Sequence, residues 1–282
     1  MTTDAMRDAG FTVEEQIIAR LARAFDIEGV ACSATICGDL ATRLAKALYA
    51  PQLLLISGHN GFDAPVRPKL LDEEQQLNPV SVCASDWQQT FDLVGHQRYA
   101  VCVGPVQVDR TGCANISLLG TDWGRPTVQL IGSRGLPDHA ANTRDGFLLH
   151  VRRHSPRVFV ERVDFRASSP YDGPLGRTGV PRVVVSDLGV LVFDPDAGQL
   201  VVESLHLGVT FDEIQAATGF ALPRRPMYPV TEPPTAEELE WLRHRLDPLG
   251  MLRMEKEGLG PELLDELLAA ERAHWVVAPA QR

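Results

Sequence analysis

The chain has 282 residues, of which 44% are hydrophobic and 23% are charged; this is the composition of an ordinary globular protein, long enough for one large α/β domain or two average domains. Its formal net charge of −10 repels phosphate backbones, which excludes the basic surface of a nucleic-acid-binding protein. No apolar run approaches the roughly 20 residues that span a bilayer, so no membrane partner is expected.

The N-terminus and the cysteines indicate a cytoplasmic protein. The first ten residues, MTTDAMRDAG, lack the basic and then apolar regions of a secretion signal. The 5 cysteines are an odd number with no C-x-x-C, which favours buried free thiols over a disulfide framework or a zinc knuckle. The 8 histidines are scattered and include no H-E-x-x-H. No metal site is therefore expected.

The first predicted unit is a helix followed by strand, helix and strand. Thr12 and Glu15 have the spacing of a capping box, and apolar residues then recur at three- and four-residue intervals. The predicted elements are a helix over 13–25, a strand over 30–36, a helix that Gly38 opens and Pro51 ends, and a strand over 53–56. Short connections of this kind are typical of a parallel sheet.

Three short apolar runs end at glycine. Residues 59–90 have no clean periodicity and are predicted as a loop with a short helix. The runs that end at glycine are 53–56 before Ser57-Gly58, 99–103 before Gly104, and 127–131 before Gly132. Ligands bind beyond the carboxyl ends of parallel strands, where glycine lets the backbone approach them closely. A further strand is expected over 157–161.

The second half of the chain is predicted as a hairpin and then helices. Strand-like runs at 182–193 and 199–205 flank a turn-rich loop, which indicates a β-hairpin. Capping boxes at Thr210/Glu213 and Thr235/Glu238 open two helices, and a last helix is expected over 261–274. We therefore expect an α/β domain over 1–222, followed over 223–282 by a proline-rich connection and helices that pack on the domain or on a partner.

The glycine loops are the candidate ligand site. No G-x-x-x-x-G-K-[ST] and no G-x-S-x-G occurs, which excludes a P-loop and the usual nucleophile elbow of α/β hydrolases. The loops at 57–61, 104–112 and 132–135 combine glycine with small polar or basic side chains. Their backbone N–H groups can hold an oxyanion or a phosphate, and a purely structural role for the glycines stays open.

These loops resemble a known family, the class I coenzyme A transferases, and in particular the β subunit of heteromeric members such as glutaconate CoA-transferase. The similar stretches are Gly104-x-x-Gln107-Val-Asp109-Arg-x-Gly112-x-x-Asn115, Gly132-Ser-Arg-Gly135, 183–190, Leu205-His-x-Gly208-Val-Thr210, 217–220 and Asp247-Pro248. They occur in the family's order from about residue 30 to 250. The resemblance implies an open, mostly parallel, Rossmann-like sheet flanked by helices, and catalysis shared with an α subunit in a heterodimer or an α2β2 assembly.

One residue departs from the family's pattern. In transferase β subunits that carry the nucleophilic glutamate, it stands just before a Ser-Gly or similar small pair and forms acyl-anhydride and thioester intermediates, for which a carboxylate is suited. Here that place reads Ile56-Ser57-Gly58. Because isoleucine cannot act as a nucleophile, no catalytic residue is expected in this chain.

A second branch of the superfamily shares this departure. The β subunit of the actinobacterial hydrolase that opens the last steroid ring is similar over the string Gln107 to Ser117, the loop Gly132 to Pro137, and the run Val185 to Val190. The resemblance implies that water attacks a cyclic ketone of an acyl-CoA, with the catalytic glutamate on the α subunit. Two alternatives stay open, namely a true CoA-transferase with its glutamate on the α subunit and a non-catalytic scaffold.

The chain would then supply the groups that hold the substrate. The candidate substrate- and CoA-binding residues are Ser57, Gly58, Gly104, Gln107, Gly132, Ser133, Arg134 and Gly135. Arg134 stands out, because a guanidinium in a glycine loop can pair with an enolate, a carboxylate or a CoA phosphate. Asp109 and Asn115 can instead form turns through bonds to their own backbone. No cofactor is expected beyond the coenzyme A of the substrate.

Overall fold

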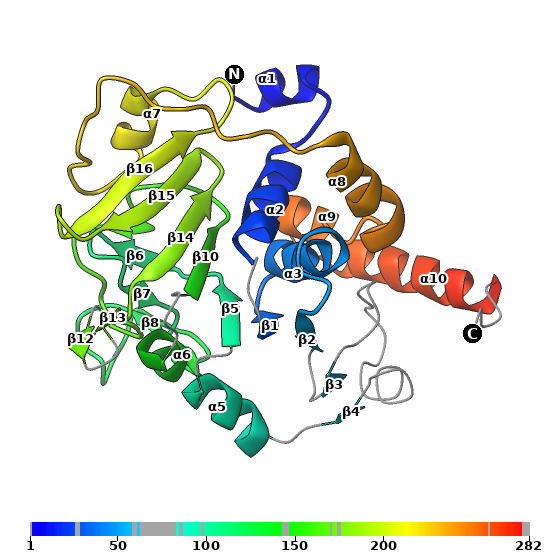
Figure 1. Cartoon of the computed structure of the whole chain (residues 1–282), viewed down its shortest axis with the longest axis horizontal. Helices are drawn as coiled ribbons and strands as arrows, with labels where there is room; N and C mark the ends of the chain where they lie inside the picture. The colour runs from blue at the N-terminus through cyan, green and yellow to red at the C-terminus, as the bar shows by residue number, and fades with distance from the viewer. Residues whose placement is uncertain are drawn as a thin grey trace.

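The computed structural model describes residues 2–25, 29–57, 61–62, 83–84, 87–96, 99–142, 147–169, 171–173, 176–258 and 260–277. Its centre is a nine-stranded sheet of order β16-β15-β14-β10-β5-β1-β2-β3-β4 (Figure 1). The parallel strands are β1 (Val30–Ser33), β2 (Leu54–Ser57), β5 (Tyr99–Val103), β10 (Phe147–Val151) and β14 (Pro181–Ser186). The expected open, mostly parallel sheet flanked by helices is confirmed.

One face of the sheet is covered by α2 (Val13–Ala24) and α3 (Ile36–Leu48) (Figure 1). Their apolar side chains form a buried cluster with Ala31, Ala100 and Leu148 from three neighbouring strands. The predicted strand, helix and strand are confirmed, but α3 begins at Ile36 and not at Gly38. Thr35 is the reason, because its Oγ1 accepts a hydrogen bond from the Gly38 backbone at 3.0 Å and caps the helix earlier.

All three predicted capping boxes are present. At the first of them the Glu15 backbone N donates to Thr12 Oγ1 at 3.2 Å, and the Thr12 backbone N donates to Glu15 Oε2 at 2.8 Å. The same reciprocal pairs occur at the starts of α7 (Phe211–Ala216) and α8 (Ala236–Glu240). Each box satisfies backbone donors that the first helical turn leaves without an intrahelical partner.

We expect Thr12→Ala to lower the free energy of unfolding by about 1 kcal/mol, the usual value of a lost N-cap. Urea denaturation of the full chain, followed by circular dichroism, measures the change. Thr12→Ser keeps the hydroxyl and is the matched control, with stability close to the wild type. Equal destabilisation by both variants would show that the methyl group of Thr12, and not the cap, matters.

The other face carries a second layer of small elements. They are β6 (Gln107–Asp109), β7 (Ala114–Asn115), β8 (Leu118–Leu119), β9 (Val128–Gln129), α5 (Trp87–Gly95), α6 (Leu136–Asn142), β11 (Phe159–Val160), β12 (Tyr171–Gly173), β13 (Gly176–Thr178) and α7. A buried cluster that includes Val101, Leu149 and Phe159 joins this layer to the sheet. The strand expected over 157–161 forms as β11, which pairs with β6 and lies outside the main sheet.

The strand predicted over 127–131 is wrong as a member of the parallel sheet. Only β9 forms there, as a two-residue partner of β8 in a separate hairpin, and Ile131 is 72% exposed. The place beside β5 is taken by β10, whose Leu148 pairs with Cys102. Both runs are apolar, so hydrophobicity does not separate them. All five residues of β10 are buried in the central core, whereas both residues of β9 are exposed.

The C-terminal part confirms the hairpin and corrects its first arm. β15 (Gly189–Asp194) and β16 (Gln199–Leu205) pair antiparallel, but the predicted run 182–193 divides at Asp187 into β14 and β15. The remaining elements are α1 (Thr2–Asp8), β3 (Gly61–Phe62), β4 (Cys83–Ala84), a π-helix (Trp241–Leu246), α9 (Arg253–Glu257) and α10 (Pro261–Val277). Among the described helices, none is both long and apolar enough to span a membrane.

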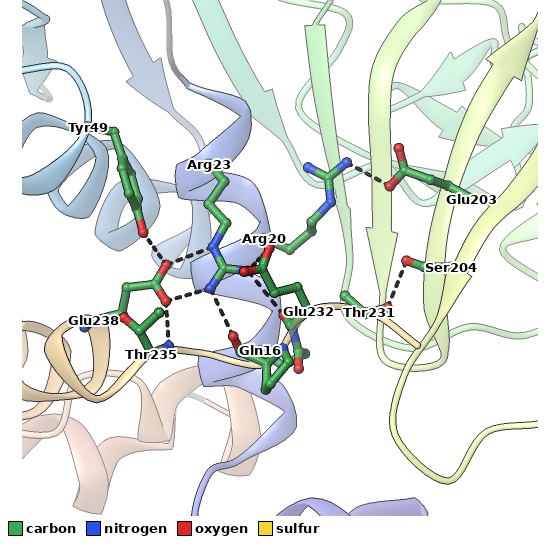
Figure 2. Close-up of polar contacts among 11 residues, drawn as sticks. Gln16, Arg20, Arg23, Tyr49, Glu203, Ser204, Thr231, Glu232, Thr235 and Glu238 are labelled. Atoms are coloured by element: carbon green, nitrogen blue, oxygen red, sulfur yellow. Dashed lines mark hydrogen bonds and ion pairs between the residues drawn. The ribbon is translucent and has the colours of Figure 1, made fainter. Parts of the chain in front are cut away.

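The segment 223–235, called the strap below, runs from the β16 side of the molecule back to α2. The Thr231 backbone N donates to the Leu205 carbonyl at 2.7 Å, so the strap extends the sheet edge for a short distance. It then passes across Gln16 and Arg23, which donate to the Glu232 carbonyl at 2.8 and 3.1 Å (Figure 2). Beyond the strap, Leu242 and Leu246 of the π-helix are buried in the same cluster as α2 and α3.

Candidate functional site

The first predicted loop lies at the carboxyl end of β2. Ile56 is the penultimate residue of this strand and Ser57 ends it. Gly58 lies outside the described residues. The Ile56 side chain is half-buried and packs against the cluster on the face opposite α2 and α3.

Gly104 follows β5 directly and approaches the turn after β1. A Cβ atom at this position would lie 2.8 Å from Thr35 Cγ2 and 3.8 Å from the His150 carbonyl oxygen. No ordinary side chain fits at the first of these distances. The ends of β1, β5 and β10 therefore meet around Gly104, as expected for the carboxyl edge of a parallel sheet.

A chain of hydrogen bonds joins the second and third predicted loops. The Asn115 amide donates to Gln107 Oε1 at 2.8 Å, and Asn115 Oδ1 accepts from the Ser117 backbone at 3.0 Å. Ser117 Oγ then lies 2.7 Å from Ser133 Oγ. The motif that spans Gln107 to Ser117 thus holds the loop that contains Ser133.

Gln107 itself is fully engaged by protein. Its Oε1 also accepts from the Asp164 backbone at 2.9 Å, and its Nε2 donates to Asp164 Oδ2 at 3.2 Å. Asp109 forms the turn that follows β6, since its Oδ1 accepts from the backbones of Thr111 and Cys113 at 2.9 and 3.1 Å. Both residues support the loop in this structure, and contact between Gln107 and a substrate stays a prediction.

Arg134 adopts an unusual backbone conformation. Its φ of 49° makes it the one non-glycine residue with positive φ in the described chain, and Gly132 before it has a φ of 89°. Such a conformation costs a non-glycine residue on the order of 1 kcal/mol. The side chain is exposed, and no hydrogen bond or ion pair is described for its guanidinium. The turn therefore presents a positive charge to solvent.

A row of three contacting side chains, His139, Tyr99 and Cys32, connects Gly135 to Ile56. A Cβ on Gly135 would lie 3.0 Å from His139 Nε2, and the His139 ring stacks on Tyr99 with centroids 4.7 Å apart. The Tyr99 hydroxyl donates to Cys32 Sγ at 2.9 Å. Cys32 and Ile56 stand one residue beyond the paired Ala31 and Leu55 on adjacent strands, so they are neighbours on the same face.

The row is uncharged at neutral pH. Burial raises the pKa of the Cys32 thiol to about 11 and raises that of the Tyr99 hydroxyl above its usual value. Burial lowers the pKa of His139 to about 4. The thiol and phenol therefore stay protonated and the imidazole stays neutral, so none of these three is an activated nucleophile or an ionised acid.

Sequence reasoning did not find Cys32, Tyr99 or His139. Tyr99 and Cys32 read as ordinary members of apolar strands, and His139 lies in a short helix with no motif around it. What the three share is their location, since all lie on the side of the sheet that carries the glycine loops. That side is known only once the strands are paired.

Similar proteins match this sequence over most of its length, although no family model matches it. The cholesterol ring-cleaving hydrolase IpdB subunit of Rhodococcus jostii (strain RHA1) is 31% identical over 217 residues, which cover 74% of this chain and 81% of that protein. The β subunit of the 3-oxoadipate CoA-transferase of Pseudomonas knackmussii is 31% identical over 215 residues, covering 72% of this chain and 81% of that protein.

Solved structures agree with these relatives. A chain of Rhodococcus jostii RHA1 IpdAB matches with a TM-score of 0.77 and 28% identity, covering 89% of this chain and 99% of that one. Glutaconate coenzyme A-transferase from Acidaminococcus fermentans matches with a TM-score of 0.74 and 22% identity, covering 85% of this chain and 96% of that one. The second similarity concerns the fold alone.

Proposed function

The chain belongs to the class I coenzyme A transferase superfamily, among its β subunits, and from this premise we propose that it is part of a heteromeric hydrolase that opens a cyclic-ketone acyl-CoA. Its partner is an α subunit of the same superfamily, in a heterodimer or an α2β2 assembly. The relatives that support this are the ring-cleaving IpdB subunits, which are 31 and 32% identical.

The observation that carries the proposal is the environment of Ile56. An acyl-transfer carboxylate at this place would need charge and solvent around it, but Ile56 packs on an apolar cluster beside the neutral Cys32 and Tyr99. The chain therefore offers binding surfaces at this face, and the proposal assigns the catalytic carboxylate to the α subunit. Water, activated by that carboxylate, replaces an acceptor acid as the reacting partner.

The reaction exchanges one C–C bond for a carboxylate and a C–H bond. Water adds to the ring ketone and forms a tetrahedral alkoxide. The bond to the neighbouring ring carbon then breaks, its electron pair passes to a carbonyl β to the ketone as an enolate, and that carbon takes up a proton. Negative charge is thus on oxygen in both steps, and the exposed guanidinium of Arg134 can stabilise it. Coenzyme A enters as part of the substrate, and the glycine loops at Gly104 and Gly132 allow its close approach.

Two further features support the assembly and its location. Trp123, Val128 and Ile131 are 61, 40 and 72% exposed on the segment between β8 and α6. Large apolar side chains that stay exposed are typical of a surface that meets another protein, and we propose that this segment contacts the α subunit. Cys32, Cys37, Cys102 and Cys113 are free, and free thiols suit the cytoplasm, where we place the protein.

The test is an assay of the purified complex of this chain with its α partner. We expect consumption of a cyclic-ketone acyl-CoA without any acceptor acid, with one oxygen of ¹⁸O-labelled water entering the new carboxylate. Mass spectrometry of the product measures both. The partner incubated without this chain is the control and is expected to be inactive.

One outcome of that assay would contradict the hydrolase. If an added carboxylate accepts coenzyme A at a comparable rate and no ¹⁸O enters the product, the chain serves a true CoA-transferase whose glutamate is on the α subunit. The 31% identity to the β subunit of a 3-oxoadipate CoA-transferase makes this the alternative to measure first. A panel of short dicarboxylic acids as acceptors is sufficient for this comparison.

A further inference from the structure

Three side chains with metal-binding atoms meet on the face opposite the candidate site. Cys37 lies in the first turn of α3, His150 lies near the carboxyl end of β10, and Glu255 lies on α9. The Cys37 sulfur, one His150 ring nitrogen and one Glu255 oxygen are all within 4.8 Å of one another. Cys37 and His150 are 1 and 4% exposed, so two of the three side chains are shielded from water.

His150 differs from the other buried histidines of the described chain. His154 and His206 each hold hydrogen bonds at both ring nitrogens, at 2.8 to 2.9 Å. No hydrogen bond is described for the ring of His150, and no hydrogen bond or ion pair is described for the Glu255 carboxylate. Thiol, imidazole and carboxylate groups that meet without bonding one another are suited to share a metal ion. The closeness of the three ligand atoms is therefore the observation that points to a metal site.

The position of α9 points to the same place. This five-residue helix has no buried residue and no side-chain cap of its own. It directly follows the buried Met251 and Leu252, which packs against the cluster of α2 and α3. Arg152, at the end of β10, donates to the Lys256 carbonyl at 3.0 Å. That bond holds the neighbouring Glu255 over His150, where its carboxylate completes the cluster.

We propose that Cys37, His150 and Glu255 bind one divalent transition-metal ion of the zinc type. Thiolate, imidazole and carboxylate are the ligands that zinc takes, at about 2.3, 2.0 to 2.1 and 2.0 to 2.2 Å. Atoms within 4.8 Å of one another surround one such ion after small side-chain movements. A fourth position remains for water on the solvent side of Glu255.

The ion has a structural role. The cluster lies on the α2 and α3 face, whereas Ile56 and Gly135 lie on the other, so the ion is separated from the candidate site by the sheet. It ties α9, which lies between the π-helix and α10 in the chain, to α3 and β10. Burial raises the pKa of Cys37 well above its usual value, so the ion binds with release of the thiol proton to solvent.

The test adds Zn²⁺ alone to the metal-free full-length chain. We expect one equivalent of zinc to remain after dialysis, measured by mass spectrometry of the metal, and a rise in Tm that EDTA reverses. With Co²⁺ in place of Zn²⁺, a thiolate-to-cobalt charge-transfer band is expected in the near ultraviolet, and Cys37→Ser abolishes it. Glu255→Gln, on a helix with no buried residue, weakens zinc binding more than about tenfold.

Two control variants accompany the test. Cys113→Ser removes another buried thiol, far from the cluster in the β6 to β7 turn, and Glu257→Gln removes an exposed carboxylate from α9 itself. Both are expected to retain one zinc and the cobalt band. The proposal is wrong if the wild type retains less than about half an equivalent, or if Glu255→Gln, with its fold checked by circular dichroism, binds zinc as tightly as the wild type. A cobalt complex without the thiolate band would also contradict it.

Discussion

Replacing Arg134 with alanine is expected to lower kcat/KM of the assembled enzyme for an acyl-CoA by about 10- to 100-fold, the effect of losing a charged hydrogen bond of roughly 1.5 to 3 kcal/mol. The guanidinium is exposed on a turn that holds its backbone at a φ of 49°. A protein keeps such strain at sites where the side chain has a use. Steady-state kinetics of the complex measures the change.

The positive φ of Arg134 also leads us to predict an effect on stability. Glycine has no penalty at positive φ, so Arg134→Gly is expected to raise Tm slightly while activity falls as in Arg134→Ala. Arg134→Lys keeps the charge but loses the planar fork, and we expect it to retain part of the activity. Arg225→Ala, which removes an exposed arginine of the strap, is the matched control and is expected to leave kinetics unchanged.

Unchanged turnover and acyl-CoA affinity in Arg134→Ala would contradict a binding role for this residue. Within an intact complex, that result would favour the scaffold alternative, in which this chain only stabilises its partner. A fall in kcat/KM that also appears in Arg225→Ala would instead indicate a general effect of net charge, which is already −10, on an anionic substrate.

Arg23→Ala is expected to lower the free energy of unfolding by about 3 to 5 kcal/mol, the usual loss when one partner of a buried ion pair is removed. Arg23 binds the Glu238 carboxylate through Nε at 3.0 Å and Nη2 at 2.6 Å (Figure 2). The Glu238 side chain is fully buried, and Tyr49 also donates to it, at 2.6 Å. Without Arg23, a buried carboxylate is left without a cation.

Two variants separate this explanation from others. Arg23→Ala combined with Glu238→Gln removes both charges and is expected to recover part of the stability, because no unpaired charge remains. Arg20→Ala is the matched control on the same helix, since the pair of Arg20 with Glu203 is half-exposed, and such pairs contribute about 1 kcal/mol or less. Equal losses in Arg20→Ala and Arg23→Ala would contradict the proposed importance of burial.

The pH dependence of this interaction has a definite sign. Burial opposes ionisation of Glu238, but hydrogen bonds from Arg23, Tyr49 and the Thr235 backbone and the charge of Arg23 outweigh it, so the pKa of Glu238 lies below its usual 4.5. The stabilisation is therefore complete above about pH 4.5 and is lost as pH falls through the lower folded pKa. Urea denaturation at pH 3 to 7 measures this. The free energies of unfolding of the wild type and of the double variant Arg23→Ala, Glu238→Gln are expected to converge at the acid end.

Local interactions are the part of the structure that the sequence by itself determined. The capping boxes at Thr12, Thr210 and Thr235 form as predicted, because each needs only residues within one helical turn. β5 has the predicted bounds, and the unit from β1 to β2 forms with a boundary shift of a few residues. The family resemblance, confirmed at 31 and 32% identity, depended on motifs that are likewise contiguous.

Only the tertiary structure decided which runs enter the sheet and which side chains meet. The runs at 127–131 and 147–151 are both apolar, but β10 pairs with β5 and β14 while β9 remains exposed. Cys37, His150 and Glu255 are far apart in the chain and have no motif spacing, so the sequence predicted no metal site. The face of Ile56 likewise depends on strand pairing. The physical reason is common to all three, because contacts between distant residues are set by how strands pair and layers pack, which no short window of sequence contains.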